Sequence, residues 1–167
     1  MRTARKLLVH YVDAAFDMTY ENTDYQKLGQ DLESLDVELN PQVETVRNIW
    51  GETSVVFSGY EPSTSVETFY HDAAKALEEK VIELAMARKY GDVCKTSYVE
   101  ALYKEGDTEN DPPVLIRAFR EDILVVPTTY GGDVNGVQSP FDIQYSGNRV
   151  AGTFDRETRK FTAESAL

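Results

Sequence analysis

The side chains best suited to chemistry at neutral pH are two histidines and one cysteine. His10 and His71 have ordinary pKa values near neutrality, and Cys94 is the only thiol. The histidines form no HExxH or HxH pattern, no GxSxG element is present, and no ligand pairs stand at zinc spacing. We therefore expect no catalytic and no cofactor-binding residues, and we predict that the protein is not an enzyme. Carboxylate pairs could still meet in the fold.

An acidic segment from Glu105 to Pro113 has the composition of a metal-binding loop. Its carboxylates alternate from Asp107 to Asp111, as calcium ligands do. However, Pro112 stands at the sixth loop position, where the calcium loop needs glycine, and Ala118 stands at the twelfth, where it needs glutamate. We expect no metal site here, and we predict a solvated hairpin tip.

A second loop, Tyr130 to Gly136, carries glycines like those of a phosphate-binding loop. It has no Lys followed by Ser or Thr, and no predicted helix follows it. Its glycines are more typical of a bulge or a bent hairpin. Cys94 alone allows no intramolecular disulfide, and its pattern favours a small apolar residue in a strand.

The elements that would position these residues are one helix and many strands. A helix is predicted from about Asp72, which can cap it, to Lys89, with Gly91 after its end. Its apolar face has residues at spacings of three and four: Ala74, Leu77, Val81, Leu84, Ala85 and the stem of Arg88. Predicted strands cover residues 7–12, 35–39, 54–60, 64–70, 96–104, 114–120, 123–130, 141–145 and 150–154. This density predicts a mainly β fold, a β-sandwich or barrel with one flanking α-helix.

Length and charge limit the possible classes of function. A chain of 167 residues predicts one domain over 1–167, in which residues 1–24 could form an extended N-terminal arm. The formal net charge of −12 disfavours binding to nucleic acid or to an anionic membrane. No apolar run is long enough for a membrane span or a signal peptide. We expect a soluble protein made in a cytoplasm.

Two blocks of turn-rich sequence occur in a characteristic order. The first is LNPQVETVRNIWGET over residues 39–53, followed by SGYEP at 58–62 and VETFY at 66–70. The second is YGGD at 130–133, followed by Pro140-Phe141 and GNRVAGTFD at 147–155. In order and spacing these blocks resemble the major tail (tail-tube) proteins of long-tailed phages of Gram-positive bacteria. Together with the helix between them they cover Tyr25 to Thr162.

This resemblance implies a structural virion protein with no catalytic residues and no cofactor. Six copies would close into a ring, and rings would stack through extended loops into a hollow tube in the virion tail. DNA and a length-setting tape-measure protein would occupy the channel, with other tail proteins at its ends. An acidic channel wall would repel the phosphates of DNA, but only over roughly 8 Å at physiological salt.

The segment Gln42 to Glu52 is the predicted subunit interface. Its apolar residues Val43, Val46, Ile49 and Trp50 are unusual for a solvated loop, so we expect the segment to be mobile alone and ordered in a tube. Ring and stack contacts both require two different surfaces that meet head to tail. Alternatively, Trp50 and Tyr60 pack in the core, as large aromatic residues commonly do.

Two other classes of function stay open. A β-sandwich that binds carbohydrate on a virion or cell surface would use exposed aromatic and acidic residues such as Trp50 and Asp133, and would be monomeric. A small ligand-binding barrel or an enzyme of unrecognised type would show a deep pocket with convergent polar groups.

We predict that the isolated protein has no measurable affinity for duplex DNA at physiological salt. The reason is the charge of −12, against which Arg2, Arg5 and Lys6 form the only local basic cluster. Fluorescence anisotropy with a labelled duplex measures this. Micromolar binding that weakens steeply with added salt would contradict it.

Overall fold

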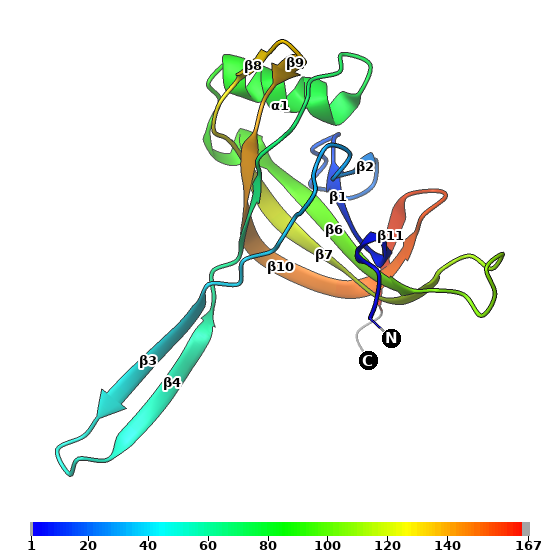
Figure 1. Ribbon diagram of the computed structural model, residues 1–167. Coiled ribbons are helices and arrows are strands. Elements are labelled where there is room, and N and C mark those ends of the chain that lie inside the picture. The colour runs from blue at the N-terminus through cyan, green and yellow to red at the C-terminus, as the bar shows by residue number, and fades with distance from the viewer. Residues whose placement is uncertain (1, 165–167) are drawn as a thin grey trace.

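The fold is a strongly curled, mainly antiparallel sheet with one flanking helix, which confirms the predicted fold class. The computed structural model describes residues 2–164 (Figure 1). The main sheet has the order β11-β10-β7-β6-β1-β2, and β5 pairs with part of β10. Its strands are β1 Leu8–Asp13, β2 Tyr25–Lys27, β5 Ser63–Val66, β6 Lys95–Lys104, β7 Val114–Pro127, β10 Phe141–Asp155 and β11 Lys160–Ala163. The remaining elements are the hairpins β3 Pro41–Arg47 with β4 Thr53–Tyr60 and β8 Gly131–Asp133 with β9 Gly136–Gln138, the helix α1 Ala76–Met86, and the short 3-10 turns Arg5–Leu7 and Gly91–Cys94.

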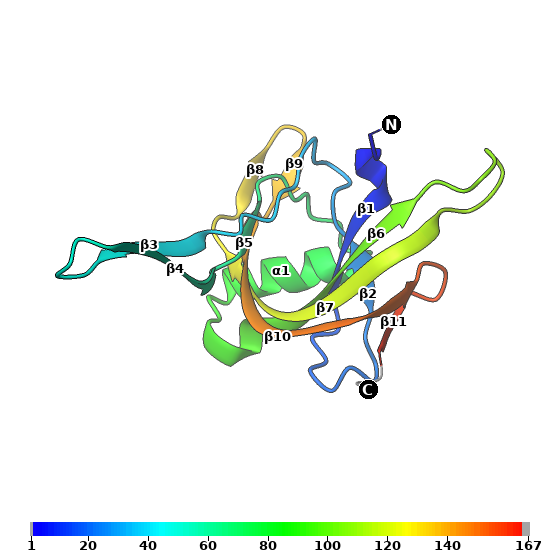
Figure 2. The same cartoon turned by 90° about the horizontal axis from the view of Figure 1, so that it is seen from below.

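The curl of the sheet creates two hydrophobic clusters, one on each face. On one face, α1 packs Leu77, Val81 and Leu84 against strand residues such as Ile123 and Ile143. The second cluster is on the opposite face, where the sheet wraps round on itself and includes Val9, Tyr11, Tyr25, Val99, Ala101, Tyr103 and Phe154. Both clusters draw on β6, β7 and β10, because successive residues of a strand point to opposite faces. Figure 2 shows α1 over the concave side of the long strands.

The predicted helix is present but shorter than expected. Asp72 does not cap it: the Asp72 carboxylate accepts a hydrogen bond from the Ala74 amide before the helix begins at Ala76. The expected apolar face is confirmed for Leu77, Val81 and Leu84, whereas Ala74 and Arg88 are exposed beyond the ends. Arg88 has a φ of +53°, so the chain leaves the helix three residues before Gly91.

Two pairs of predicted strands are each one long strand. The sequence predicts separate strands 114–120 and 123–130 on either side of the acidic pair Glu121-Asp122. In the structure, β7 continues through this pair as one strand. The gap between the predicted strands 141–145 and 150–154 is an irregularity inside β10, where the pairing with β7 shifts register between Tyr145 and Val150. Positive φ values of 100° at Gly147 and 56° at Asn148 accommodate this shift.

Two other expectations at the N-terminal side are corrected. Residues 35–39 alternate like a strand, but they form only one bridge, between Glu38 and Ser63. Of their three apolar side chains, Leu35 alone is buried. Within the stretch 1–24, β1 lies inside the sheet between β6 and β2, so an extended arm does not include residues 8–13.

We predict that truncating either cluster destabilises the whole sheet. Leu84→Ala should lower the free energy of unfolding by about 2–5 kcal/mol and Phe154→Ala by about 3–5 kcal/mol, because both leave cavities in dry cores. Met86→Ala, at a position that is 62% exposed, is the control and should change it by less than about 0.5 kcal/mol. Urea unfolding followed by circular dichroism measures these changes. A Leu84 variant as stable as the Met86 variant would show that α1 does not support the sheet.

Candidate functional site

The hairpin of β3 and β4 is the part of the fold most available to a partner. Among the described residues its strands pair only with each other, from Pro41 opposite Tyr60 to Arg47 opposite Thr53. Figures 1 and 2 show it projecting away from the sheet and helix. A lone two-stranded ribbon is only marginally stable in water. Contacts with another surface would therefore stabilise it.

Apolar side chains cover both faces of this hairpin. Val43 lies opposite Phe57, and Thr45 lies opposite Val55, so these four side chains share one face. The exposed apolar residues of the hairpin are Val43, Val46, Ile49, Trp50, Val55, Val56, Phe57 and Tyr60. At the turn, Ile49 is 96% and Trp50 79% exposed. Contiguous exposed apolar surface of this kind marks interaction sites in soluble proteins.

The structure brings together the four predicted interface residues and adds a second set. Val43, Val46, Ile49 and Trp50 all lie on β3 or its turn, and their role in an interface stays a prediction. Sequence reasoning missed the apolar surface of β4, which contains Val55, Val56 and Phe57. The available signal was that these three consecutive apolar residues break the alternation of a half-buried strand. The interpretation of Trp50 and Tyr60 as core residues is wrong, since both are more than half exposed.

The segment Gln42 to Glu52 is not a loop, as the sequence suggested, but a strand and a tight turn. Its Val and Thr residues favour extended backbone. The Asn48 side-chain oxygen accepts hydrogen bonds from the amides of Trp50 and Glu52, both at 3.0 Å, and Gly51 has a φ of +78°. The turn therefore holds Ile49 and Trp50 at the tip without support from any core.

The root of the hairpin is tied to the body by polar contacts. Glu38 and Ser63 exchange both backbone hydrogen bonds, at 2.8 and 2.9 Å. Asn40, with a φ of +46°, donates from its side-chain amide to the Glu61 carbonyl at 3.1 Å. These bonds fix the direction in which the hairpin leaves the sheet.

The other two predicted loops are surface hairpins. The acidic segment Glu105 to Pro113 forms the exposed tip between β6 and β7, as expected. The glycine loop is the β8–β9 hairpin, in which a Cβ on Gly132 would lie 2.1 Å from the Gly136 carbonyl oxygen, so close backbone approach requires glycine. Across residues 2–164, no three His, Cys, Asp or Glu side chains gather closely enough to hold a metal ion.

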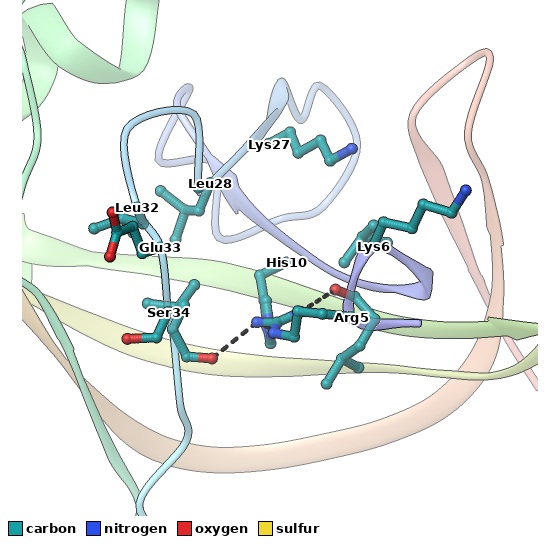
Figure 3. Close-up of a pocket in the computed structure, with 12 residues that line it drawn as sticks. Arg5, Lys6, His10, Lys27, Leu28, Leu32, Glu33 and Ser34 are labelled. Carbon is teal, nitrogen blue, oxygen red and sulfur yellow. Dashed lines mark hydrogen bonds between the residues drawn. The ribbon is translucent and has the colours of Figure 1, made fainter. Parts of the chain in front are cut away.

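His10 belongs to a buried polar network. In the cleft of Figure 3, Arg5 lies beside it and donates to the carbonyls of Leu8 and Leu35 at 2.6 and 2.8 Å. His10 Nε2 lies 3.1 Å from an Arg5 nitrogen, so it accepts, and Nδ1 then donates to the Tyr98 hydroxyl. Burial, helped by the Arg5 charge, lowers the pKa of His10 to about 4. His10 is thus neutral at pH 7 and ties β1 to β6.

The other two chemistry-bearing residues also make structural contacts. His71 lies before α1 and is 2.7 Å from the Glu79 carboxylate. Burial raises the pKa of the Cys94 thiol, which disfavours the reactive thiolate. The Cys94 thiol donates a hydrogen bond to the Lys89 backbone carbonyl at 3.5 Å.

Comparison with known proteins adds no identification. No family model matches the sequence, and no curated protein is significantly similar to it. None of the helices within residues 2–164 has the length and apolar character needed to cross a bilayer.

We predict that the free energy of unfolding falls by about 2 kcal/mol when the pH is lowered from 7 to 5, because of His10. Its folded-state pKa of about 4 is below the ordinary value of 6.5, so the unfolded chain binds the extra proton in this range. Asp13, whose pKa is raised by burial, acts in the opposite direction at lower pH. Urea unfolding at several pH values measures the effect.

The matched control is His10→Gln, whose amide can still donate to Tyr98. This variant should lose most of the pH dependence between pH 7 and pH 5. An unchanged dependence in the variant would assign the effect to other groups.

Proposed function

We propose that this protein is a major tail (tail-tube) protein of a long-tailed phage, a subunit that polymerises as stacked, hexameric rings into the tube through which DNA passes. The observation that carries the proposal is the uncovered apolar hairpin. It adds to the resemblance of the two sequence blocks, the first of which includes this hairpin and the second the β8–β9 hairpin and much of β10.

An assembly role accounts for apolar surface that a monomer leaves in water. Burying apolar area contributes roughly 25 cal/mol per Å², so a hairpin with eight exposed apolar residues can supply a large part of a subunit contact. The sheet is also open, and the outer edges of β2 and β11 pair with no other strand in the described part of the chain. Edge strands of this kind can add neighbouring subunits.

The acidic character is consistent with a channel that DNA traverses without being held. Each subunit carries a formal charge of −12, which favours repulsion of phosphate over binding. The acidic tip between β6 and β7 points away from the β3–β4 hairpin (Figure 1), so its charge would not enter a contact made by that hairpin. In this proposal the tip lies at a rim or an outer surface.

The alternative role in carbohydrate binding loses its suggested site. Trp50 is in the turn of the β3–β4 hairpin and Asp133 is in β8, and Figure 1 places these hairpins at opposite ends of the molecule. One glycan site cannot combine them. A glycan site on this fold would need other residues.

Electron microscopy of the concentrated protein tests the proposal, and we expect rings or tubes of uniform diameter. Trp50→Ala should abolish them while the subunit stays folded, because the tip makes no core contact. Trp50 is the only tryptophan, so its emission should also shift to shorter wavelength on assembly.

Two variants serve as controls. Tyr90→Ala removes another aromatic residue of similar exposure, at 89%, and the pair Asp107→Ala with Glu109→Ala removes charge from the acidic tip. Both should still form tubes. A wild-type protein that stays monomeric at its highest soluble concentration, even with other tail components, would overturn the proposal, as would normal tubes from a well-folded Trp50→Ala protein.

A further inference from the structure

The turn of the β8–β9 hairpin contains the only asparagine of the chain that is followed by glycine, Asn135-Gly136. The other asparagines are Asn22, Asn40, Asn48, Asn110 and Asn148, which precede Thr, Pro, Ile, Asp and Arg in that order. A side chain on the following residue hinders attack of that residue's backbone nitrogen on the asparagine amide, and glycine has no side chain. Asn135-Gly136 is therefore the pair in this chain best suited to close into a cyclic imide.

The side chain of Asn135 is exposed and free to move. Its amide group makes no hydrogen bond within residues 2–164, where only the backbone amide of Asn135 bonds, to the Asp133 carboxylate at 2.8 Å. In contrast, the side-chain amides of Asn40, Asn48 and Asn148 each donate a hydrogen bond. The Asn135 Cγ can thus turn toward the Gly136 nitrogen without breaking a side-chain contact.

The Gly136 nitrogen becomes available when this short hairpin opens. The strands β8 and β9 have three residues each and form a separate two-stranded sheet, in which Gly136 lies opposite Asp133. Such a small ribbon is only marginally stable. Its local opening needs much less free energy than unfolding of the whole chain. The body of the protein can therefore stay folded while Gly136 reacts.

A histidine held by a carboxylate borders the same shallow hollow as Asn135. The hollow has a volume of about 640 Å³, and both His71 and Asn135 line it. In neutral His71, Nε2 donates to the Glu79 carboxylate at 2.7 Å, so Nδ1 carries no proton and can accept one. The His71 backbone amide donates to the Val137 carbonyl at 2.8 Å, which places His71 next to the residue that follows Gly136.

We propose that Asn135 is a site of deamidation in which His71 transfers the proton. His71 Nδ1 takes the proton from the Gly136 nitrogen, which attacks the Asn135 Cγ. The N–Cγ bond forms and the Cγ–Nδ2 bond breaks, and His71 returns the proton to Nδ2, which leaves as ammonia. Water then opens the cyclic imide at either carbonyl and leaves aspartate or isoaspartate at position 135. This inference goes beyond the tail-tube proposal and does not rest on it.

The two products change the hairpin differently. Aspartate keeps the main chain and adds a carboxylate two residues after Asp133. Isoaspartate adds a methylene group to the main chain, in a turn where a Cβ on Gly132 would already lie 2.1 Å from the Gly136 carbonyl oxygen. The lengthened turn cannot keep this register. Because the hairpin lies beside α1 (Figure 1) and binds the preceding segment through the His71–Val137 bond, isoaspartate should loosen that segment.

Incubation of the full-length protein at mildly alkaline pH, followed by peptide mass mapping, tests the site. The peptide with Asn135 should gain about 1 Da, with isoaspartate detected by an isoaspartate-specific methyltransferase. Asn135 should react at least about tenfold faster than Asn48 or Asn148 in the same sample. Asn135→Gln should remove the signal, because its longer side chain closes a ring more slowly.

A second variant tests the proton transfer. His71→Gln can still donate to Glu79 but cannot exchange a proton, so it should slow the reaction of Asn135 by about tenfold or more. Gln30→Ala removes another residue that lines the hollow and should change the rate by less than about twofold. A variant that only loosened the hairpin would react faster, so a slower rate assigns the proton transfer to His71. Hydrogen exchange of the amide at position 71 checks that hairpin opening is unchanged.

The outcomes separate this inference from the proposed function. Reaction of Asn135 no faster than that of Asn48 and Asn148 would overturn the site. An unchanged rate in a folded His71→Gln protein would overturn the role of His71. Fast deamidation of a protein that never forms tubes would support the site while the tail-tube role fails.

Discussion

The fold depends on the pairing of two long strands, β7 and β10. They remain paired from Phe141 opposite Pro127 to Gly152 opposite Ala118, and every other strand of the main sheet attaches directly or indirectly to this pair. Because a strand presents alternate residues to its two faces, the pair contributes to both hydrophobic clusters at once. The sheet buries both faces by curling. The helix α1 covers one face, and on the other face the curl brings residues of β1, β2 and β10 together in the second cluster.

Buried charge in the middle of the sheet explains the irregular part of β10. Glu121 and Asp122 are buried, and such carboxylates are costly unless partners surround them. The register shift supplies those partners: Asn148 donates to Asp122 at 3.3 Å, and Arg149 donates to Glu121 at 3.0 Å. The acidic pair in β7 and the glycine-containing bulge in β10 are thus two halves of one feature.

The proposed function rests on what this arrangement leaves uncovered. The curled sheet and α1 bury the apolar residues of the body, and the β3–β4 hairpin places another apolar set outside it. A hairpin rooted by backbone bonds and Asn40 has a defined direction, so it presents Trp50 at a fixed distance from the sheet. Contiguous exposed apolar surface of this kind marks interaction sites in soluble proteins.

The sequence alone determined the fold class, the position of α1 and the polar hairpin tips, because periodicity, turn residues and charge are local properties. It also marked Val43, Val46, Ile49 and Trp50 as unusual, since apolar residues in a turn-rich segment need an explanation. Only the tertiary structure decided that this segment is a strand, that Val55, Val56 and Phe57 face solvent beside it, and that Trp50 is outside the core. Those outcomes depend on which strands find partners in the sheet. β4 has the composition of a buried strand, but within residues 2–164 it pairs only with β3 and projects away from the main sheet (Figure 1).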